Sequence, residues 1–177
     1  AMGGAGLVFT EMTQVSREAR ISPGDAGMYE DRHMEAWKKV VDFVHTRTDA
    51  KIGMQIGHAG RKACEPIAWK RNTPLTDDEK WEIVGPSAIK FGPNSEMPKE
   101  MNQSDIAKVV DDFVSAAKRA DQAGFDIIEI HAGHGYLLSS FMSPLSNQRT
   151  DAYGGSLENR MKLSLEVYHA VRAVWPD

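Results

Sequence analysis

The sequence contains one cysteine, Cys64, among its 177 residues. A lone thiol cannot build the disulfide framework of a small secreted domain, so cysteine usage is typical of a protein from a reducing cytoplasm. No apolar run approaches the ~20 residues of a transmembrane helix. The glycine-rich start, residues 1–6, lacks the basic and apolar segments of a signal peptide. These absences predict a cytoplasmic protein with no membrane partner.

An excess of basic residues is also absent. Lysine and arginine number 21 against 25 acidic residues, and the resulting net charge of -4 gives no reason to expect nucleic acid as a partner. Neither a Gly-x-Gly-x-x-Gly motif nor a P-loop occurs, so the sequence predicts neither a Rossmann nor a Walker nucleotide site. The hydrophobic fraction of 41% is ordinary for a soluble domain with its own core.

Strand-like and helix-like apolar patterns alternate along the chain. We expect strands at 7–10, 51–57 and 125–131, and helices at 31–47, from an N-cap at Ser104 to a stop at Gly124, and at 157–174. A proline-containing stretch between 58 and 103 is long enough to predict a functional loop. Strands joined through helices should be parallel with right-handed crossovers, as in a doubly wound sheet or a (β/α)8 barrel.

The strand at 51–57 favours the barrel. One of its faces carries Lys51, Gly53, Gln55 and Gly57, and the other carries Ile52, Met54 and Ile56. A central strand of an open sheet is apolar on both faces, whereas a barrel strand can aim polar groups inward. Three strands cannot close a barrel of eight. We therefore expect residues 1–177 to be one partial α/β domain covering about strands 2–4, truncated at both ends, from a parent of roughly 250 residues or more.

The segment after the third strand holds the densest chemistry, at His131, His134 and Tyr136. Two imidazoles three residues apart can lie on one side and donate hydrogen bonds to one oxygen, which would stabilise negative charge there. The Tyr136 hydroxyl is suited to giving a proton late in a reaction. The alternatives are a metal-binding pair, although no third ligand pattern accompanies it, structural loop histidines, and a tyrosine that serves only packing.

Other polar residues near strand ends allow more than one interpretation. The carboxamide of Gln55 matches the alternating carbonyl and N–H edge of a flavin pyrimidine or a nucleobase, or it is a satisfied barrel glutamine. The basic segment 58–62 is either a phosphate site or a solvated loop. Glu11 and Glu129 are read as barrel-interior ion pairs, with Lys51 as a candidate partner, before they are read as catalytic acids.

Several segments together resemble the Old Yellow Enzyme family of FMN-dependent ene-reductases, in its bacterial NADPH dehydrogenase branch. The resemblance runs nearly end to end, is weakest in 64–100, and is most specific in 124–160. The matching stretches are 6–11 (GLVFTE), 55–62 (QIGHAGRK), 123–137 (AGFDIIEIHAGHGYL), 143–151 (SPLSNQRTD) and 153–160 (YGGSLENR).

The resemblance implies a role for each matching position. Gln55 would bond the flavin pyrimidine, and Met12 would lie near the flavin where the family often has a small residue. His131 and His134 would hold the carbonyl oxygen of an activated alkene. Tyr136 would give a proton to Cα while reduced FMN delivers hydride to Cβ, with NAD(P)H as the reductant. The implied activity is C=C reduction in an α,β-unsaturated carbonyl compound.

A narrower likeness links residues 13–16, 20–24 and 137–141 to the reductase part of aryl-CoA (salicylyl- or 2-aminobenzoyl-CoA) mono-oxygenase/reductases, which implies a CoA thioester as the alternative substrate. Related dienoyl-CoA reductases lack the first histidine of the pair, so His131 favours the simple enone. A third reading is a non-catalytic half-barrel or assembly module, and a second copy of the chain is an expected partner in a homo-oligomer. Because a first strand and strands five to eight are missing, we expect the chain alone to bind FMN poorly.

Overall fold

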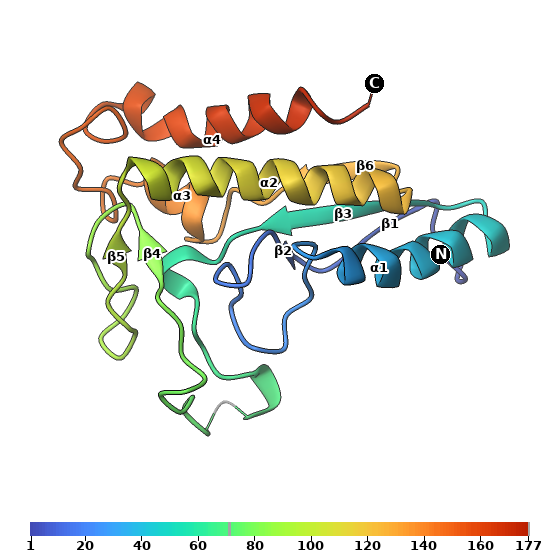
Figure 1. Ribbon diagram of the computed structural model, residues 1–177, viewed down its shortest axis with the longest axis horizontal. Helices are drawn as coiled ribbons and strands as arrows, with labels where there is room; N and C mark the ends of the chain where they lie inside the picture. Colours follow the sequence, from blue (N-terminus) through green and yellow to red (C-terminus); the bar gives the residue numbers. More distant parts are fainter. Residues whose placement is uncertain (71, 177) are drawn as a thin grey trace.

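The computed structural model describes residues 1–70 and 72–176, and their main feature is a parallel β-sheet (Figure 1). The sheet contains β1 (Leu7–Phe9), β2 (Thr13–Gln14), β3 (Lys51–Gly57) and β6 (Ile127–Ile130). β3 is central, with β6 on one edge and both β1 and β2 on the other. Because β1 and β2 pair with successive parts of β3, they fill one interrupted strand position, so the sheet has three parallel positions.

Long helices connect these strand positions. α1 (Asp31–Arg47) leads to β3, α2 (Gln103–Ala123) leads to β6, and α4 (Leu157–Arg172) follows the short α3 (Leu137–Met142). The predicted alternation of three parallel strands with three long helices is confirmed. The first and third strands and the last helix are shorter than predicted, and α3 was not predicted. Within residues 1–70 and 72–176, none of the helices has the length and apolarity needed to cross a membrane.

The predicted N-cap of α2 was wrong. Ser104 lies inside the helix, and the cap is Asn102, whose side chain accepts a hydrogen bond from the backbone N–H of Asp105 at 2.9 Å. The Asp105 carboxylate accepts from the backbone N–H of Asn102 at 2.9 Å in return. This reciprocal capping box satisfies two donors of the first turn, which a serine two positions later cannot do. Ser104 instead donates its hydroxyl to the Asn102 side chain at 2.6 Å.

The stretch between β3 and α2 is folded rather than irregular throughout. It contains the 3-10 turns η1 (Gly60–Lys62) and η2 (Ala68–Lys70), and the paired strands β4 (Val84–Gly85) and β5 (Lys99–Glu100). Its own small apolar cluster is formed by buried Ala59, Ala63, Cys64 and Ile83, with Ile21, Leu75, Trp81 and Tyr136 packed against them. Tyr136 comes from the segment after β6, so this excursion packs directly against the predicted site.

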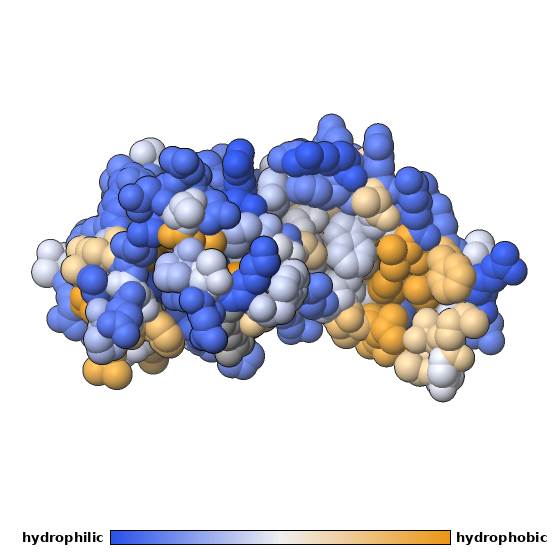
Figure 2. All heavy atoms as spheres, turned by 90° about the horizontal axis from the view of Figure 1, so that it is seen from below, coloured by the Kyte–Doolittle hydropathy of each residue, from blue (hydrophilic) through white to orange (hydrophobic). Residues whose placement is uncertain are grey.

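The two faces of β3 have different surroundings. Ile52, Met54 and Ile56 are at most 4% exposed and belong to the main core, into which α1 and α2 pack. On the other face, no described helix covers the sheet, and the side chains of Leu7, Phe9 and Ile127 in β1 and β6 remain exposed. Figure 2 shows apolar side chains gathered at the right-hand end of the molecule, where Figure 1 places β1. The predicted one-sided strand, typical of a barrel wall, is confirmed.

The Asp126 carboxylate, directly before β6, links the amino-terminal ends of β3 and β6. Asp126 accepts hydrogen bonds from the Ile52 N–H at 2.9 Å, from Lys51 Nζ at 2.8 Å and from His45 Nε2 at 2.7 Å. Burial opposes ionisation, yet these donors hold the pKa of Asp126 at about 2. Lys51 therefore pairs with Asp126 and not with either predicted acid: Glu11 and Glu129 are both exposed, and Glu129 instead accepts a hydrogen bond from Gln55.

Candidate active site

The predicted site residues meet where β3 and β6 end. The chain leaves β6 with the His131 N–H bonded to the Ile56 carbonyl at 2.8 Å, so the strand register extends to His131. The segment then turns back, and the Leu137 N–H donates to the His58 carbonyl at 2.9 Å as α3 begins. These two backbone bonds fix both ends of the 131–137 segment against β3. Active sites of (β/α)8 enzymes are built at this carboxyl edge of the strands.

The two imidazoles lie on the same side of the backbone and contact each other. His131 Nε2 and His134 Nδ1 are 2.9 Å apart, and the ring centroids are 5.0 Å apart. The Gly133 N–H donates to His131 Nδ1 at 3.3 Å, so in the neutral ring the proton of His131 is on Nε2 and points at His134. An oxygen at hydrogen-bond distance from both facing nitrogens can accept from both once His134 carries its proton on Nδ1.

The two histidines differ in burial, and burial affects the charge of His131. His131 is 8% exposed, whereas His134 is open to solvent. Burial lowers the pKa of His131 below its usual value, and the facing His134 lowers it further. His131 is therefore neutral at pH 7. Its Nε2–H can donate a hydrogen bond to an oxygen, but the ring carries no second proton to transfer.

An unusual backbone conformation holds His134 in place. Its φ of 58° lies in the left-handed region, where a residue other than glycine is strained, and Gly135 follows at φ 73°. Lys62 Nζ donates to the His134 carbonyl at 3.0 Å. The ammonium also lies 4.8 Å from the Tyr136 ring centroid and 4.6 Å from that of Phe91. Lys62 thus joins the turn to the excursion that precedes α2.

Tyr136 lies beside the histidine pair. Its ring centroid is 5.0 Å from that of His131, with the planes inclined by 66°. Burial raises the pKa of the Tyr136 hydroxyl, and the charge of Asp25 raises it further. The hydroxyl consequently stays protonated at neutral pH and can serve as a proton donor.

Gln55 and Met12 lie on the uncovered face of the sheet that leads to this edge. Gln55 donates from Nε2 to the Glu129 carboxylate at 2.8 Å, so its carboxamide is held in the plane between β3 and β6. Two residues further, Gly57 has no side chain, and a Cβ there would come within 2.6 Å of Met12 Sδ and 3.2 Å of His131 Cβ. Met12 and His131 therefore flank Gly57, and the missing Cβ lets both side chains pack close to the backbone of β3 near Gln55.

Four contributors to this site were not predicted as such. Lys62 and Arg61 belong to the segment read as a phosphate site or a solvated loop, yet Lys62 holds the His134 carbonyl and Arg61 donates to the carbonyls of Ile89 and Lys90. Phe91 comes from the weakly matching part of the excursion. Gly57 could have been found, because it shares the alternation of Gln55 on the polar face. The contacts of Lys62 and Phe91 depend on the tertiary fold.

Residues 143–151, which belong to the most specific part of the resemblance, make contacts that stabilise the fold. Arg149 is buried, and its Nη1 donates to the carbonyls of Pro86 at 3.0 Å and Met101 at 2.6 Å. Its Nε and Nη2 bind the two carboxylate oxygens of Asp151 at 3.0 and 2.5 Å. This bidentate pair orients the guanidinium, and the two bonds from Nη1 tie the loop after α3 to the excursion. The part of the chain that the structure describes contains no cluster of three or more His, Cys, Asp or Glu arranged to hold a metal ion.

Comparison with known proteins agrees with this arrangement. A family model described as NADH:flavin oxidoreductase / NADH oxidase matches residues 1–175. The NADPH dehydrogenase of Geobacillus thermodenitrificans (strain NG80-2) is 46% identical over 175 residues, which cover 99% of this chain and 47% of that protein.

Solved structures extend the comparison to the fold. Morphinone reductase in complex with tetrahydroNAD superposes with a TM-score of 0.85 at 33% identity, covering 97% of this chain and 48% of that one. Old Yellow Enzyme from Pichia sp. AKU4542 gives 0.84 at 36% identity, covering 96% and 44%. The chain spans slightly less than half the length of these relatives, and the prediction of a partial (β/α)8 barrel is confirmed. By sequence and by fold, the chain belongs to the NADH:flavin oxidoreductase / NADH oxidase family.

Proposed function

We propose that the full-length protein is an FMN-dependent NAD(P)H oxidoreductase that reduces the C=C bond of an α,β-unsaturated carbonyl compound. Residues 1–177 would contribute the substrate-oxygen site and the proton donor. One observation carries the proposal: His131 Nε2 and His134 Nδ1 converge to 2.9 Å at the carboxyl edge of a barrel-type sheet. Two donors converging on one carbonyl oxygen stabilise the negative charge that develops there when the alkene is reduced.

The residues on the uncovered face fit a flat flavin ring. The Gln55 carboxamide presents both a donor and an acceptor, as a pyrimidine edge requires. Gly57, which has no Cβ, lets the side chains of Met12 and His131 pack close to the backbone at the end of this face. When bound, FMN supplies the hydride, and NAD(P)H restores the reduced cofactor. Morphinone reductase, to which this chain is similar, has been solved with tetrahydroNAD, which supports a nicotinamide reductant.

Protein groups would then perform the polar steps. His131, kept neutral by burial, and His134 would both donate to the substrate oxygen and orient the alkene. Tyr136, 5.0 Å from the His131 ring, would donate its hydroxyl proton to the α-carbon. The cation of Lys62 over the Tyr136 ring face would help to fix the ring while leaving the hydroxyl free.

The substrate could also be a thioester. A CoA thioester offers the same type of carbonyl oxygen to the histidine pair, so aryl-CoA or enoyl-CoA compounds belong in the substrate series beside simple enones. For the chain alone we retain the proposal of a non-catalytic half-barrel, because the uncovered sheet face exposes Leu7, Phe9 and Ile127. A homo-oligomer is part of the same proposal.

The test is the visible spectrum of the purified full-length protein with and without a para-substituted phenol. We expect bound flavin and, on addition of phenol, a long-wavelength charge-transfer band that is lost in His131→Ala and His134→Ala. A second readout, phenol affinity by calorimetry, should fall in both variants because each removes one donor to the phenolate oxygen. A colourless protein that takes up no FMN, or variants that bind phenol unchanged, would contradict the proposal.

A further inference from the structure

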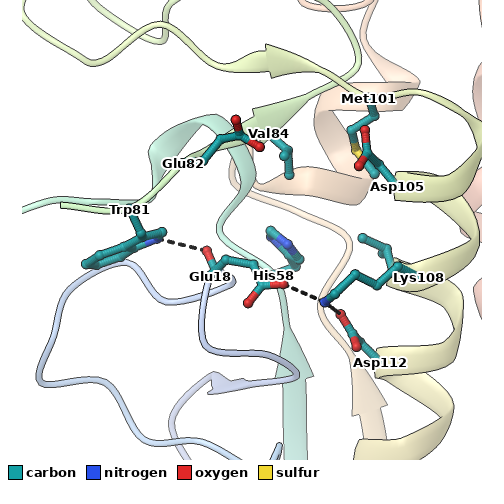
Figure 3. Close-up of a pocket in the computed structure, with 10 residues that line it drawn as sticks. Glu18, His58, Trp81, Glu82, Val84, Met101, Asp105, Lys108 and Asp112 are labelled. Carbon is teal, nitrogen blue, oxygen red and sulfur yellow. Dashed lines mark hydrogen bonds and ion pairs between the residues drawn. The ribbon is translucent and has the colours of Figure 1, made fainter.

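A cavity of about 320 Å³ lies between α2 and the 81–84 segment, apart from the candidate active site (Figure 3). None of the residues assigned above to substrate or flavin lines it. Its volume is roughly ten times the ~30 Å³ that one molecule occupies in liquid water, so it admits a small organic molecule. The cavity is lined by charged groups on α2 and around Glu18, by the imidazole of His58, and by apolar side chains.

His58 lines this cavity and carries a donor that is unpaired within the described residues. The residue is only 3% exposed, and its Nδ1 accepts a hydrogen bond from the Gly60 N–H at 3.0 Å. Burial lowers the pKa of His58 to about 4, so the ring is neutral at pH 7 and its one proton is on Nε2. Within residues 1–70 and 72–176, no group accepts a hydrogen bond from Nε2. Nε2 is not among the enclosed polar atoms without a partner, so solvent in the cavity reaches it, and a ligand that displaces this solvent has to supply an acceptor.

The charged lining carries an excess of carboxylates. Lys108 Nζ contacts Glu18 at 2.5 Å and Asp112 at 2.7 Å, so one ammonium faces two carboxylates (Figure 3). Burial raises the pKa of Asp112, and the nearby charge of Glu18 raises it further, as expected where negative charge is incompletely balanced. Across the cavity, Glu82 and Asp105 similarly share Lys99 at 3.4 and 3.2 Å.

The remaining lining is apolar. Val84, Met101 and Val109 contribute hydrocarbon surface between the two carboxylate groups. A ligand that matches all three features has a positive charge for the carboxylates, a hydrocarbon part for these side chains, and an oxygen that accepts from His58. An anion would meet four carboxylates against two ammonium groups, and a purely apolar molecule would leave the His58 donor without an acceptor.

We propose that this cavity is a second ligand site, for a small organic cation that carries a hydroxyl or carbonyl oxygen, of the amino alcohol class. The oxygen accepts from His58 Nε2, and the ammonium lies against the Glu18–Asp112 carboxylates. The site does not depend on flavin or on the proposed reductase activity, so its test is separate from the test of that activity.

The experiment follows the His58 ring by long-range ¹H–¹⁵N NMR of the full-length protein at constant pH and ionic strength. Ethanolamine and aminopropanol should give saturable shifts of the His58 ring nitrogens. Ethylamine, which lacks the oxygen, should bind more weakly, and ethylene glycol, which lacks the charge, should not saturate. No saturable shift with either amino alcohol, or an equal response to ethylene glycol, would overturn the proposal and leave only water in the cavity.

A matched pair of variants tests the charge requirement. Asp112→Asn removes a carboxylate that lines the cavity, and ethanolamine should bind about tenfold more weakly because a charge-assisted contact is lost. Asp111→Asn removes a neighbouring exposed carboxylate that does not line the cavity, and it should bind as the parent does. If Asp112→Asn does not fold, Glu18→Gln makes the same test. Equal loss in the cavity variant and in Asp111→Asn would contradict the proposal.

Discussion

His131 Nε2 and His134 Nδ1 face each other at 2.9 Å, and each residue is held in position by a further hydrogen bond. The Gly133 N–H donates to the other ring nitrogen of His131, Nδ1. His134 has a left-handed backbone conformation, and its carbonyl accepts a hydrogen bond from Lys62. A ligand oxygen therefore replaces an existing hydrogen bond and requires the Nδ1–H tautomer of His134. Because that exchange is favoured by a strong acceptor, the pair should prefer electron-rich oxygens such as enolates and phenolates.

Replacing Tyr136 by phenylalanine should separate the two half-reactions of the full-length enzyme. Loss of the proton donor should slow alkene reduction by about 100-fold or more, the usual range for general-acid catalysis. Flavin reduction by NAD(P)H should remain within a few-fold of the parent, since it needs no proton from this hydroxyl. Stopped-flow measurement of each half-reaction checks this, with the exposed Tyr168→Phe as control. Equal slowing of both half-reactions would argue against a proton-donor role.

Gly60→Ala should be more damaging than Gly155→Ala, although both glycines have positive φ. The φ angles are 60° and 79°, so each alanine carries a similar left-handed cost of roughly 1–2 kcal/mol. A Cβ at Gly60 would also lie 2.9 Å from Leu137 Cα, whereas one at Gly155 would meet nothing within 4 Å. Overpacking typically adds about 1–3 kcal/mol. Urea denaturation of both variants measures the difference.

The position of Leu137 gives that comparison a functional readout. Because the clash displaces the residue next to Tyr136, Gly60→Ala should also slow alkene reduction in the full-length enzyme. Gly155→Ala should leave that rate nearly unchanged. Variants with the same free energy of unfolding would show that the segment 58–62 can move away from α3 at little cost.

Asn102→Ala should destabilise the protein by about 1 kcal/mol, because it removes the side-chain half of the capping box on α2. Ser104→Ala should change the free energy of unfolding much less, since Ser104 only supports the Asn102 side chain from an exposed position. Chemical denaturation with equal m-values in the two variants checks the order. The reverse order would restore Ser104 as the helix cap.

His58 should make stability depend on pH in the weakly acidic range. Its pKa is about 4 in the folded protein against an ordinary value of 6.5, because burial disfavours the charged ring. Above pH 6.5 both states are neutral and the full stability is present. As the pH falls from 6.5 to 4 the unfolded chain binds the proton preferentially, and stability should fall by about 3 kcal/mol.

The His58→Gln variant isolates this effect. Burial also lowers the pKa of His33 and His131, so the informative quantity is the difference between parent and variant across pH 4 to 6.5. The variant should lose less stability over that interval. Asp126, with a pKa of about 2 against 3.8, contributes only at lower pH and does not interfere. Parallel curves for parent and variant would rule out His58 as the titrating group.

Particular residues show how much of the structure could be predicted from local sequence patterns. The alternation in 51–57 was sufficient to predict which face of β3 meets the helices, because side chains of a strand point to opposite faces in turn. The resemblance implied that Gln55 and the histidines serve one site. The local pattern did not predict the cap of α2, since Asn102 and Ser104 are both good cap residues and only the reciprocal bond with Asp105 distinguishes them.

By itself, the sequence determined the order of strands and helices, the polar face of β3 and the identity of the imidazole and phenol groups after β6, because these follow from local periodicity and residue chemistry. Tertiary structure decided what those groups touch. The bond from Lys62 to the His134 carbonyl spans 72 positions, and the ion pair of Lys108 with Glu18 spans 90. Contacts between segments so far apart are set by how the excursion and α2 pack, and no local pattern encodes that.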